Sequence, residues 1–94
     1  MQEIHSVSGK SNQIFQFKIS KDGLNLVMRY GHSEDIEQGM AYLFPVWLYS
    51  EPKTARQAAF QWISGFPTAG EKVKKTICDF VEQMVNNKLT TKPA

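Results

Sequence analysis

Five basic side chains have the types and spacing that favour binding chemistry. Lys72, Lys74 and Lys75 lie at the start of a predicted helix, where each cation opposes the positive end of the helix dipole by about 0.3–1 kcal/mol. Lys18 and Arg29 lie on neighbouring predicted strands. Lysines kept where stability alone favours acids either form a solvated helix face or bind an anion, and the strand cations could add to an anion-binding surface. These five residues are therefore the candidate partner-binding residues.

The residues that could bind a metal or attack a substrate are few and poorly spaced for either role. His5 and His32 are not at metal-ligand spacing from each other or from Cys78, whereas a zinc site needs three or four suitable ligands. Cys78 falls beside the apolar stripe of a predicted helix with no base near it in sequence, which favours a buried structural thiol. The sequence predicts neither a metal site nor a cofactor.

A short acidic segment, residues 34–37, carries three carboxylates that could serve as an acid pair in hydrolysis. Adjacent carboxylates in a polar loop lack the apolar surroundings that raise the pKa of one of them, so a solvated loop is the better interpretation. The chain also contains no phosphate-binding glycine loop, nucleophile elbow or dinucleotide fingerprint. We therefore expect a protein that is not an enzyme.

Length and composition predict one small globular domain spanning residues 1–94. The chain has 41% hydrophobic and 21% charged residues, which argues against a disordered chain or a coiled coil. Its formal net charge of +2 is too weak to indicate nucleic-acid binding by itself. With no apolar run long enough for a membrane span, no secretory signal and a single cysteine, we expect a cytoplasmic protein without membrane contact.

Alternating apolar residues predict an antiparallel sheet in the N-terminal half. Residues 13–20 and 24–30 alternate with a period of two, as half-buried strands do. The Asp22-Gly23 pair between them is a strong hairpin signal, because glycine adopts the positive φ that such turns require. Residues 4–8 are a shorter and more polar candidate strand, followed by a turn at 9–12.

The middle of the chain combines an acidic segment with the most apolar one. Residues 32–39 are turn-like, with a single helical turn capped by Ser33 as one option. Residues 40–49 are rich in aromatic side chains and are interpreted as a strand. Pro45 cannot donate to a strand ladder, so this strand belongs at a sheet edge or contains a bulge.

The C-terminal half predicts two amphipathic helices. Overlapping start signals from Ser50 onward include a Thr54–Gln57 capping box, and Gly65 with Pro67 ends the first helix. A second capping box, Thr68–Glu71, begins a helix whose apolar stripe continues to about residue 87.

Strands followed by helices predict an α+β fold. We expect a three- to four-stranded antiparallel sheet within residues 1–49, a two-helix hairpin at 50–88 packed on one face of it, and a frayed tail at 89–94. The expected core at the helix–sheet contact comprises Phe15, Phe17, Leu26, Met28, Trp62 and Phe80. The opposite sheet face, either solvated or a docking surface, should carry Gln16, Lys18, Asn25, Val27 and Arg29.

The junction between the predicted helices resembles that of a known family. Residues 62–70 read W-x-x-G-φ-P-x-x-G, with φ an apolar residue, and are similar to the interhelical junction of a small phage-encoded type I-F anti-CRISPR family. That family also has an N-terminal antiparallel sheet with a short hairpin, and residues 21–23 lie where its turn would lie. The order of secondary-structure elements is similar over most of the chain, but the sequence pattern is similar only at the junction.

The resemblance implies a non-enzymatic wedge that binds backbone subunits of a CRISPR surveillance complex and prevents its guide RNA from pairing with target DNA. Its contacts come from aromatic and acidic residues on the sheet side. This chain departs from the family there, because Ser20 stands where an aromatic residue is expected and the loop after the second strand is longer. No contact residues are therefore carried over.

The sequence predicts a small non-enzymatic protein that binds and inhibits a host defence nucleoprotein complex by occluding its nucleic-acid path. The expected partner is a host protein or ribonucleoprotein complex, any contact with nucleic-acid phosphate is indirect, and the protein is a monomer or weak dimer. Two alternatives stay open. One is a nucleic-acid-binding module that uses the same lysines; the other is a phage or mobile-element structural protein that self-associates through Tyr42, Trp47 and Tyr49.

Overall fold

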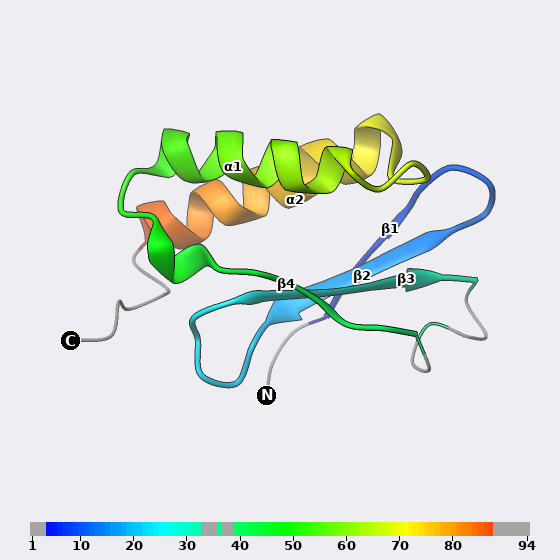
Figure 1. Ribbon diagram of the computed structural model, residues 1–94, viewed down its shortest axis with the longest axis horizontal. Helices are drawn as coiled ribbons and strands as arrows, with labels where there is room; N and C mark the ends of the chain where they lie inside the picture. The colour runs from blue at the N-terminus through cyan, green and yellow to red at the C-terminus, as the bar shows by residue number, and fades with distance from the viewer. Residues whose placement is uncertain (1–3, 33–35, 37–38, 88–94) are drawn as a thin grey trace.

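Four strands and two helices make up the described part of the chain, which comprises residues 4–32, 36 and 39–87 of a computed structural model (Figure 1). The strands form one antiparallel sheet in the order β1-β2-β3-β4, and both helices cover the same face of it (Figure 1). This arrangement confirms the predicted α+β fold. The elements are β1 (His5–Ser8), β2 (Ile14–Ile19), β3 (Leu26–Gly31), β4 (Tyr42–Phe44), the 3-10 helix η2 (Val46–Leu48), α1 (Pro52–Ser64) and α2 (Gly70–Asn86).

The hairpin between β2 and β3 forms as predicted, but its turn is longer than the sequence suggested. The last cross-strand pair is Ile19 with Leu26, so Leu24 lies in the turn and not in the strand. Gly23 adopts a φ of +75°, and its N–H donates to the Ser20 carbonyl at 2.9 Å. The Asp22 carboxylate accepts hydrogen bonds from the Ser20 hydroxyl and the Leu24 N–H, which lower its pKa, the Ser20 bond most.

The turn between β1 and β2 ties the sheet to the helical layer. Ser11 and Asn12 both adopt left-handed backbone, with φ values of 56° and 60°, and the Gln13 N–H donates to the Lys10 carbonyl at 3.0 Å. The Lys10 N–H in turn donates to the carbonyl of Thr68, in the loop between the helices, at 2.6 Å. One end of the sheet is thereby anchored to the helical hairpin.

The predicted strand at residues 40–49 is a strand only at Tyr42–Phe44. Pro45 interrupts it because its nitrogen carries no hydrogen for a ladder bond. The backbone then forms η2, in which the Leu48 N–H donates to the Pro45 carbonyl at 3.2 Å. The expectation of an edge strand is correct, since β4 pairs only with β3 among the described strands. The predicted helical turn capped by Ser33 and the predicted tail at 89–94 lie outside the described residues.

Neither predicted capping box is used. α1 begins at Pro52 without a side-chain cap, so Thr54 is already inside the helix. α2 begins at Gly70, which adopts a φ of +73°. Glycine adopts this conformation readily, whereas residues with a Cβ atom do so only at a cost in free energy. This bend places Thr68 one residue before the N-cap, where its hydroxyl is buried without a hydrogen-bond partner.

The core lies between the inner sheet face and the two helices. Phe15 and Phe17 of β2 and Leu26 and Met28 of β3 are buried, as the alternating pattern predicts. The prediction is less accurate for Trp62 and Phe80, which are only partly buried at the margin of this core. The buried helical residues are Ala55, Ala59, Ile63, Val73, Ile77, Cys78, Val81, Met84 and Val85.

Trp62 and Phe80 each close one side of the interface between the layers. The centre of the Trp62 ring lies 5.5 Å from the centre of the Phe44 ring and 5.4 Å from the centre of the Phe66 ring. On the other side, the centre of the Phe80 ring lies 5.2 Å from that of Phe17 and 4.9 Å from that of His5. Aromatic contacts of this geometry add to the stabilisation by apolar burial.

Candidate functional site

The sheet face opposite the helices brings Lys18 and Arg29 close together. Side chains alternate between the two faces of a strand, so burial of Phe15 and Phe17 places Gln16 and Lys18 on this open face. In the cross-strand register Gln16 pairs with Arg29 and Lys18 pairs with Val27, so the two cations lie diagonally across neighbouring strands. Diagonal partners are within reach of long side chains, and together the pair forms a small basic centre.

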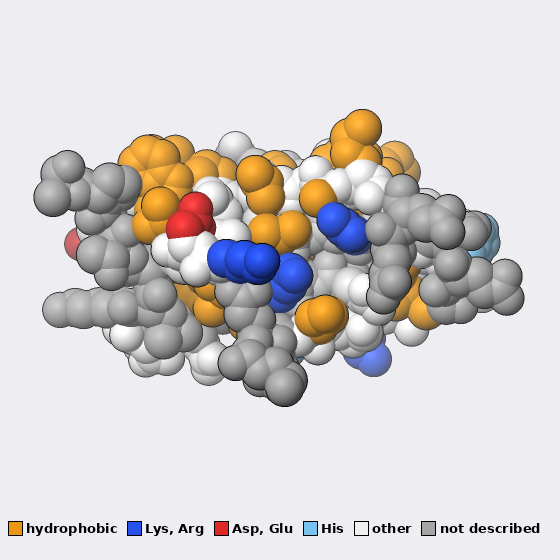
Figure 2. Space-filling view, turned by 90° about the horizontal axis from the view of Figure 1, so that it is seen from below, with side chains coloured by type: hydrophobic (Ala, Val, Ile, Leu, Met, Phe, Trp, Pro, Cys, Tyr) orange, Lys and Arg blue, Asp and Glu red, His pale blue; other side chains and the backbone are white. Residues whose placement is uncertain are grey.

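Apolar side chains lie beside this basic centre. Lys18, Arg29, Gln16, Phe17, Val27 and Ile4 line a shallow depression of about 320 Å³. Leu43 of β4 pairs with Val27 and lies on the same face, with 56% of its surface exposed. Figure 2 views this open face, with basic side chains near the centre and hydrophobic ones along its upper edge. Ser8 and Ile14 lie on the same side of the sheet, farther along the strands. The name open face is used for the residues nearest the basic centre: Ile4, Ser6, Gln16, Lys18, Val27, Arg29 and Leu43.

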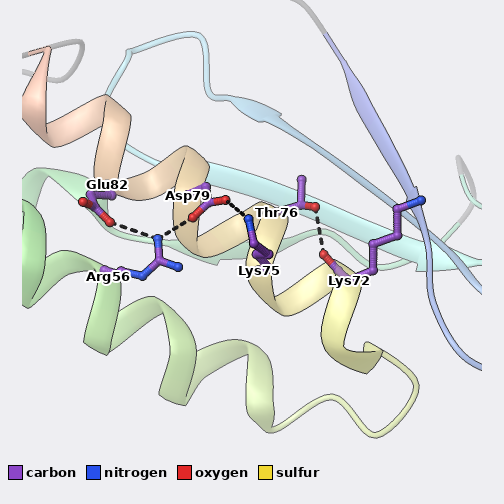
Figure 3. A network of polar contacts seen from close by, with 6 residues as sticks. All are labelled: Arg56, Lys72, Lys75, Thr76, Asp79 and Glu82. Atoms are coloured by element: carbon purple, nitrogen blue, oxygen red, sulfur yellow. Dashed lines mark hydrogen bonds and ion pairs between the residues drawn. The ribbon is translucent and has the colours of Figure 1, made fainter.

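Lys74 and Lys75 of α2 form ion pairs within the helical layer, and the three lysines of this helix do not form one patch. The Lys75 ammonium binds the Asp79 carboxylate at 3.1 Å. The Lys74 ammonium lies 3.9 Å from a carboxylate oxygen of Glu71 and 5.9 Å from the ring centre of Phe60. Lys72 is exposed, and its side chain points away from the Lys75–Asp79 pair (Figure 3). The charge density of the cluster is therefore lower than its spacing in the sequence suggests.

An ion-pair network joins the two helices beside these lysines (Figure 3). Arg56 of α1 donates to Asp79 at 2.5 Å and to Glu82 at 2.9 Å, both on α2. The hydrogen bond from Arg56, followed by that from Lys75, lowers the pKa of Asp79, and the Asp79 hydrogen bond raises the pKa of Arg56. These ion pairs stabilise the contact between α1 and α2, and their positive and negative side chains alternate on the surface of the helical layer.

The groove between the helices contains the other residues of chemical interest. It has a volume of about 410 Å³ and is lined by Arg56, Phe60, Lys74, Lys75 and Cys78, among others. Cys78 is buried, and burial raises the pKa of its thiol, which keeps it protonated at neutral pH. Within the part of the chain that the structure describes, no group of three or more His, Cys, Asp or Glu side chains is placed to hold a metal ion.

The five candidate binding residues thus fall into two separate sets. Lys18 and Arg29 share the open face, whereas Lys72, Lys74 and Lys75 belong to the helical layer on the other side of the sheet (Figure 1). Sequence reasoning missed Arg56, whose carboxylate partners are 23 and 26 residues away. It also missed Leu43, although alternation around the buried Phe44 places Leu43 on the opposite face.

Comparisons with known proteins do not identify a family. No protein-family model matches the chain, and neither the curated proteins nor the solved structures include a significant match. Among the described residues, no helix is both long and apolar enough to cross a membrane.

Proposed function

We propose that this protein is a non-enzymatic binding protein that docks through its open face onto an anionic surface of a host defence nucleoprotein complex and obstructs the nucleic-acid path. The observation that carries the proposal is the diagonal pair of Lys18 and Arg29 beside Val27 and Leu43. Two cations next to apolar side chains form a surface that can bind carboxylates or phosphates and exclude water around them.

The side chains of the open face favour a protein partner over a single-stranded nucleic acid. Non-specific recognition of single strands relies on aromatic rings that stack on bases. Phe17, the aromatic residue that lines the depression, is only 1% exposed, so its ring is not available for stacking. The aromatic residues of the strands, Phe15, Phe17 and Tyr30 among them, pack toward the helices instead. Protein interfaces combine apolar side chains with a polar rim, and arginine is enriched in them. The open face joins Arg29 to Val27 and Leu43, so we assign it to an acidic protein surface of the complex.

The inhibitory part of the proposal is supported by the resemblance of residues 62–70 to the interhelical junction of type I-F anti-CRISPR proteins. In the structure this segment connects α1 to α2. The order of sheet and helices is also the order of that family. The basic open face differs from the aromatic and acidic contact surface of the family, so the two would recognise different surfaces of a target complex.

An interference assay tests the proposal. The protein is expressed in a bacterium with an active type I-F system and challenged with a targeted phage, and the purified complex is assayed for target-DNA binding. We expect the wild type to restore plaques and to block DNA binding. The Lys18→Glu, Arg29→Glu double variant should weaken binding to the complex at least about tenfold, since contacts of charged interface pairs contribute about 1 kcal/mol or more each.

The matched control is the Lys72→Glu, Lys75→Glu double variant, which makes the same charge change on the helical layer. It should retain inhibition if the open face is the interface. If only this control variant lost inhibition, the result would assign the interface to α2 and not to the open face. The nucleic-acid-binding alternative predicts a different result. The protein would then bind free RNA or DNA with an affinity that falls steeply with added salt, and it would not bind the nuclease-treated complex.

A further inference from the structure

β4 is an edge strand whose outer side has no strand partner among the described residues. Its three residues pair with β3 on one side only. An unpaired strand edge presents backbone N–H and C=O groups that can bind another strand. Natural proteins usually protect such edges with charged side chains or proline, and here Pro45 limits pairing to Tyr42–Phe44.

The segment around β4 is both uncharged and apolar. From Gly39 to Tyr49 the sequence contains no charged residue. Three of the five large hydrophobic side chains that the described residues expose lie in it: Met40 at 70%, Leu43 at 56% and Leu48 at 51%. The opposite edge strand, β1, has the sequence HSVS and is mostly polar. Exposed apolar surface concentrated at one sheet edge is typical of an interaction site.

We propose that two copies of this chain pair antiparallel through their β4 edges. A strand edge is completed by another strand, and a second β4 offers the same short, apolar, uncharged edge. A two-fold axis near Leu43 would place the two Leu43 side chains next to each other, which is the self-complementary contact of a symmetric dimer. No like charges oppose one another across this contact, and the segment has no charge with which to select a charged partner.

The dimer joins the two sheets into one and places their open faces side by side. Two Lys18–Arg29 pairs then face the same direction, which permits bivalent binding to a partner with repeated subunits. The contact is small, because only three residues of each chain can pair and stable interfaces usually bury about 1,200 Å² or more in total. The dimer therefore forms at high concentration and dissociates on dilution.

Sedimentation equilibrium of the purified full chain tests the pairing. At about 150 mM salt, between about 20 µM and 1 mM protein, the average mass should rise above the 10.7 kDa of one chain. Leu43→Lys should raise the dissociation constant at least about tenfold, because it places two cations at the two-fold axis. Met40→Lys, outside the strand, should have a smaller effect in the same direction.

Phe60→Lys is the matched control, since Phe60 is a similarly exposed apolar residue on the helical layer. It should leave the dissociation constant within about twofold, and circular dichroism should show that all variants fold. A monomeric mass at 1 mM would overturn the proposal. A dimer that Leu43→Lys leaves intact, or that Phe60→Lys abolishes, would also overturn it, because either result places the contact elsewhere.

Discussion

Single residues in this protein derive their roles from contacts between segments that are far apart in the chain. Gly9 lies at the point where the β1–β2 turn meets the loop between the helices. A Cβ atom there would lie 2.4 Å from the Thr68 carbonyl oxygen and 2.7 Å from the Phe15 ring. Gly65, which the sequence marks as a helix stop, has an ordinary helical φ of −73° and does not require glycine.

Alanine substitution should therefore separate these two glycines. Gly9→Ala should destabilise the fold by about 1–3 kcal/mol, because the added methyl group overlaps a backbone oxygen that the Lys10 N–H already binds. Gly65→Ala should be neutral or stabilise by up to about 1 kcal/mol, because alanine lowers the entropy of the unfolded chain. Urea unfolding of both variants measures the difference, and similar losses in the two would contradict the close approach at Gly9.

The Asp79 carboxylate provides a pH test of the interhelical ion pairs. Because Arg56 and Lys75 hold the pKa of Asp79 below its ordinary value, these pairs stabilise the protein fully above about pH 5 and lose their effect as the pH falls through the folded-state pKa. Both partners are well exposed, so screening limits each pair to about 0.2–1 kcal/mol. Asp79→Asn should be less stable than wild type at pH 7, and this gap should narrow toward pH 3. A constant gap across urea titrations would show that the charge of Asp79 contributes nothing.

At the scale of elements, α2 carries its lysines in positions with opposite consequences for stability. Lys72 is the third residue of the helix, beside N–H groups that favour negative charge. Lys75 is four residues before Asp79 and binds it. The argument from sequence, that acids would be more stable than lysines at the start of this helix, treats the three positions as equivalent, whereas the structure distinguishes them.

Single charge reversals should show this difference directly. Lys72→Glu should stabilise the protein by about 0.3–1 kcal/mol through the helix dipole. Lys75→Glu should destabilise it by about 0.5–1 kcal/mol, because an attractive pair with Asp79 becomes a repulsive one. Thermal unfolding at low salt gives both signs, and about 1 M salt should reduce both effects. Two changes of the same sign would refute the assignment of Lys75 to Asp79.

At the scale of the whole molecule, one face of the sheet holds the fold together and the other carries the residues of the proposed docking surface. The helical layer and the inner face contribute the apolar core, while the two cations and Leu43 occupy the open face. Trp62 links the layers from the margin, through Phe44 of β4 and Phe66 after α1. Ile63, its neighbour in the chain, is fully buried at the centre.

The position of Trp62 lowers the expected cost of removing it. A fully buried tryptophan costs about 3–5 kcal/mol when replaced by alanine, but the part of the Trp62 ring that remains in water contributes little, so we expect about 2 kcal/mol. Ile63→Ala should cost at least as much, because a cavity in the centre of the core cannot collapse easily. Urea unfolding compares the two variants. A larger loss for Trp62→Ala than for Ile63→Ala would place the centre of the core nearer the tryptophan.

The sequence by itself determined the architecture and the faces of the central strands. The alternation of Phe15 and Phe17 with Gln16 and Lys18 depends on the period of a strand, and the helical stripes depend on the period of a helix. These local patterns predicted the sheet, the order of elements and the placement of Lys18 and Arg29 on one face. They also placed Asp22-Gly23 in the hairpin turn.

Only the tertiary structure decided which residues meet across the molecule. The Arg56–Asp79 contact joins residues on different helices, the exclusion of a side chain at Gly9 depends on the loop at Thr68, and the division of the five cations between two layers depends on how the helices cover the sheet. The start of α2 depends on the backbone of Gly70, and the end of β4 depends on Pro45, so the sequence predicted neither the helix cap nor the length of that strand correctly. Each of these outcomes arises from contacts between distant segments, which no local periodicity encodes.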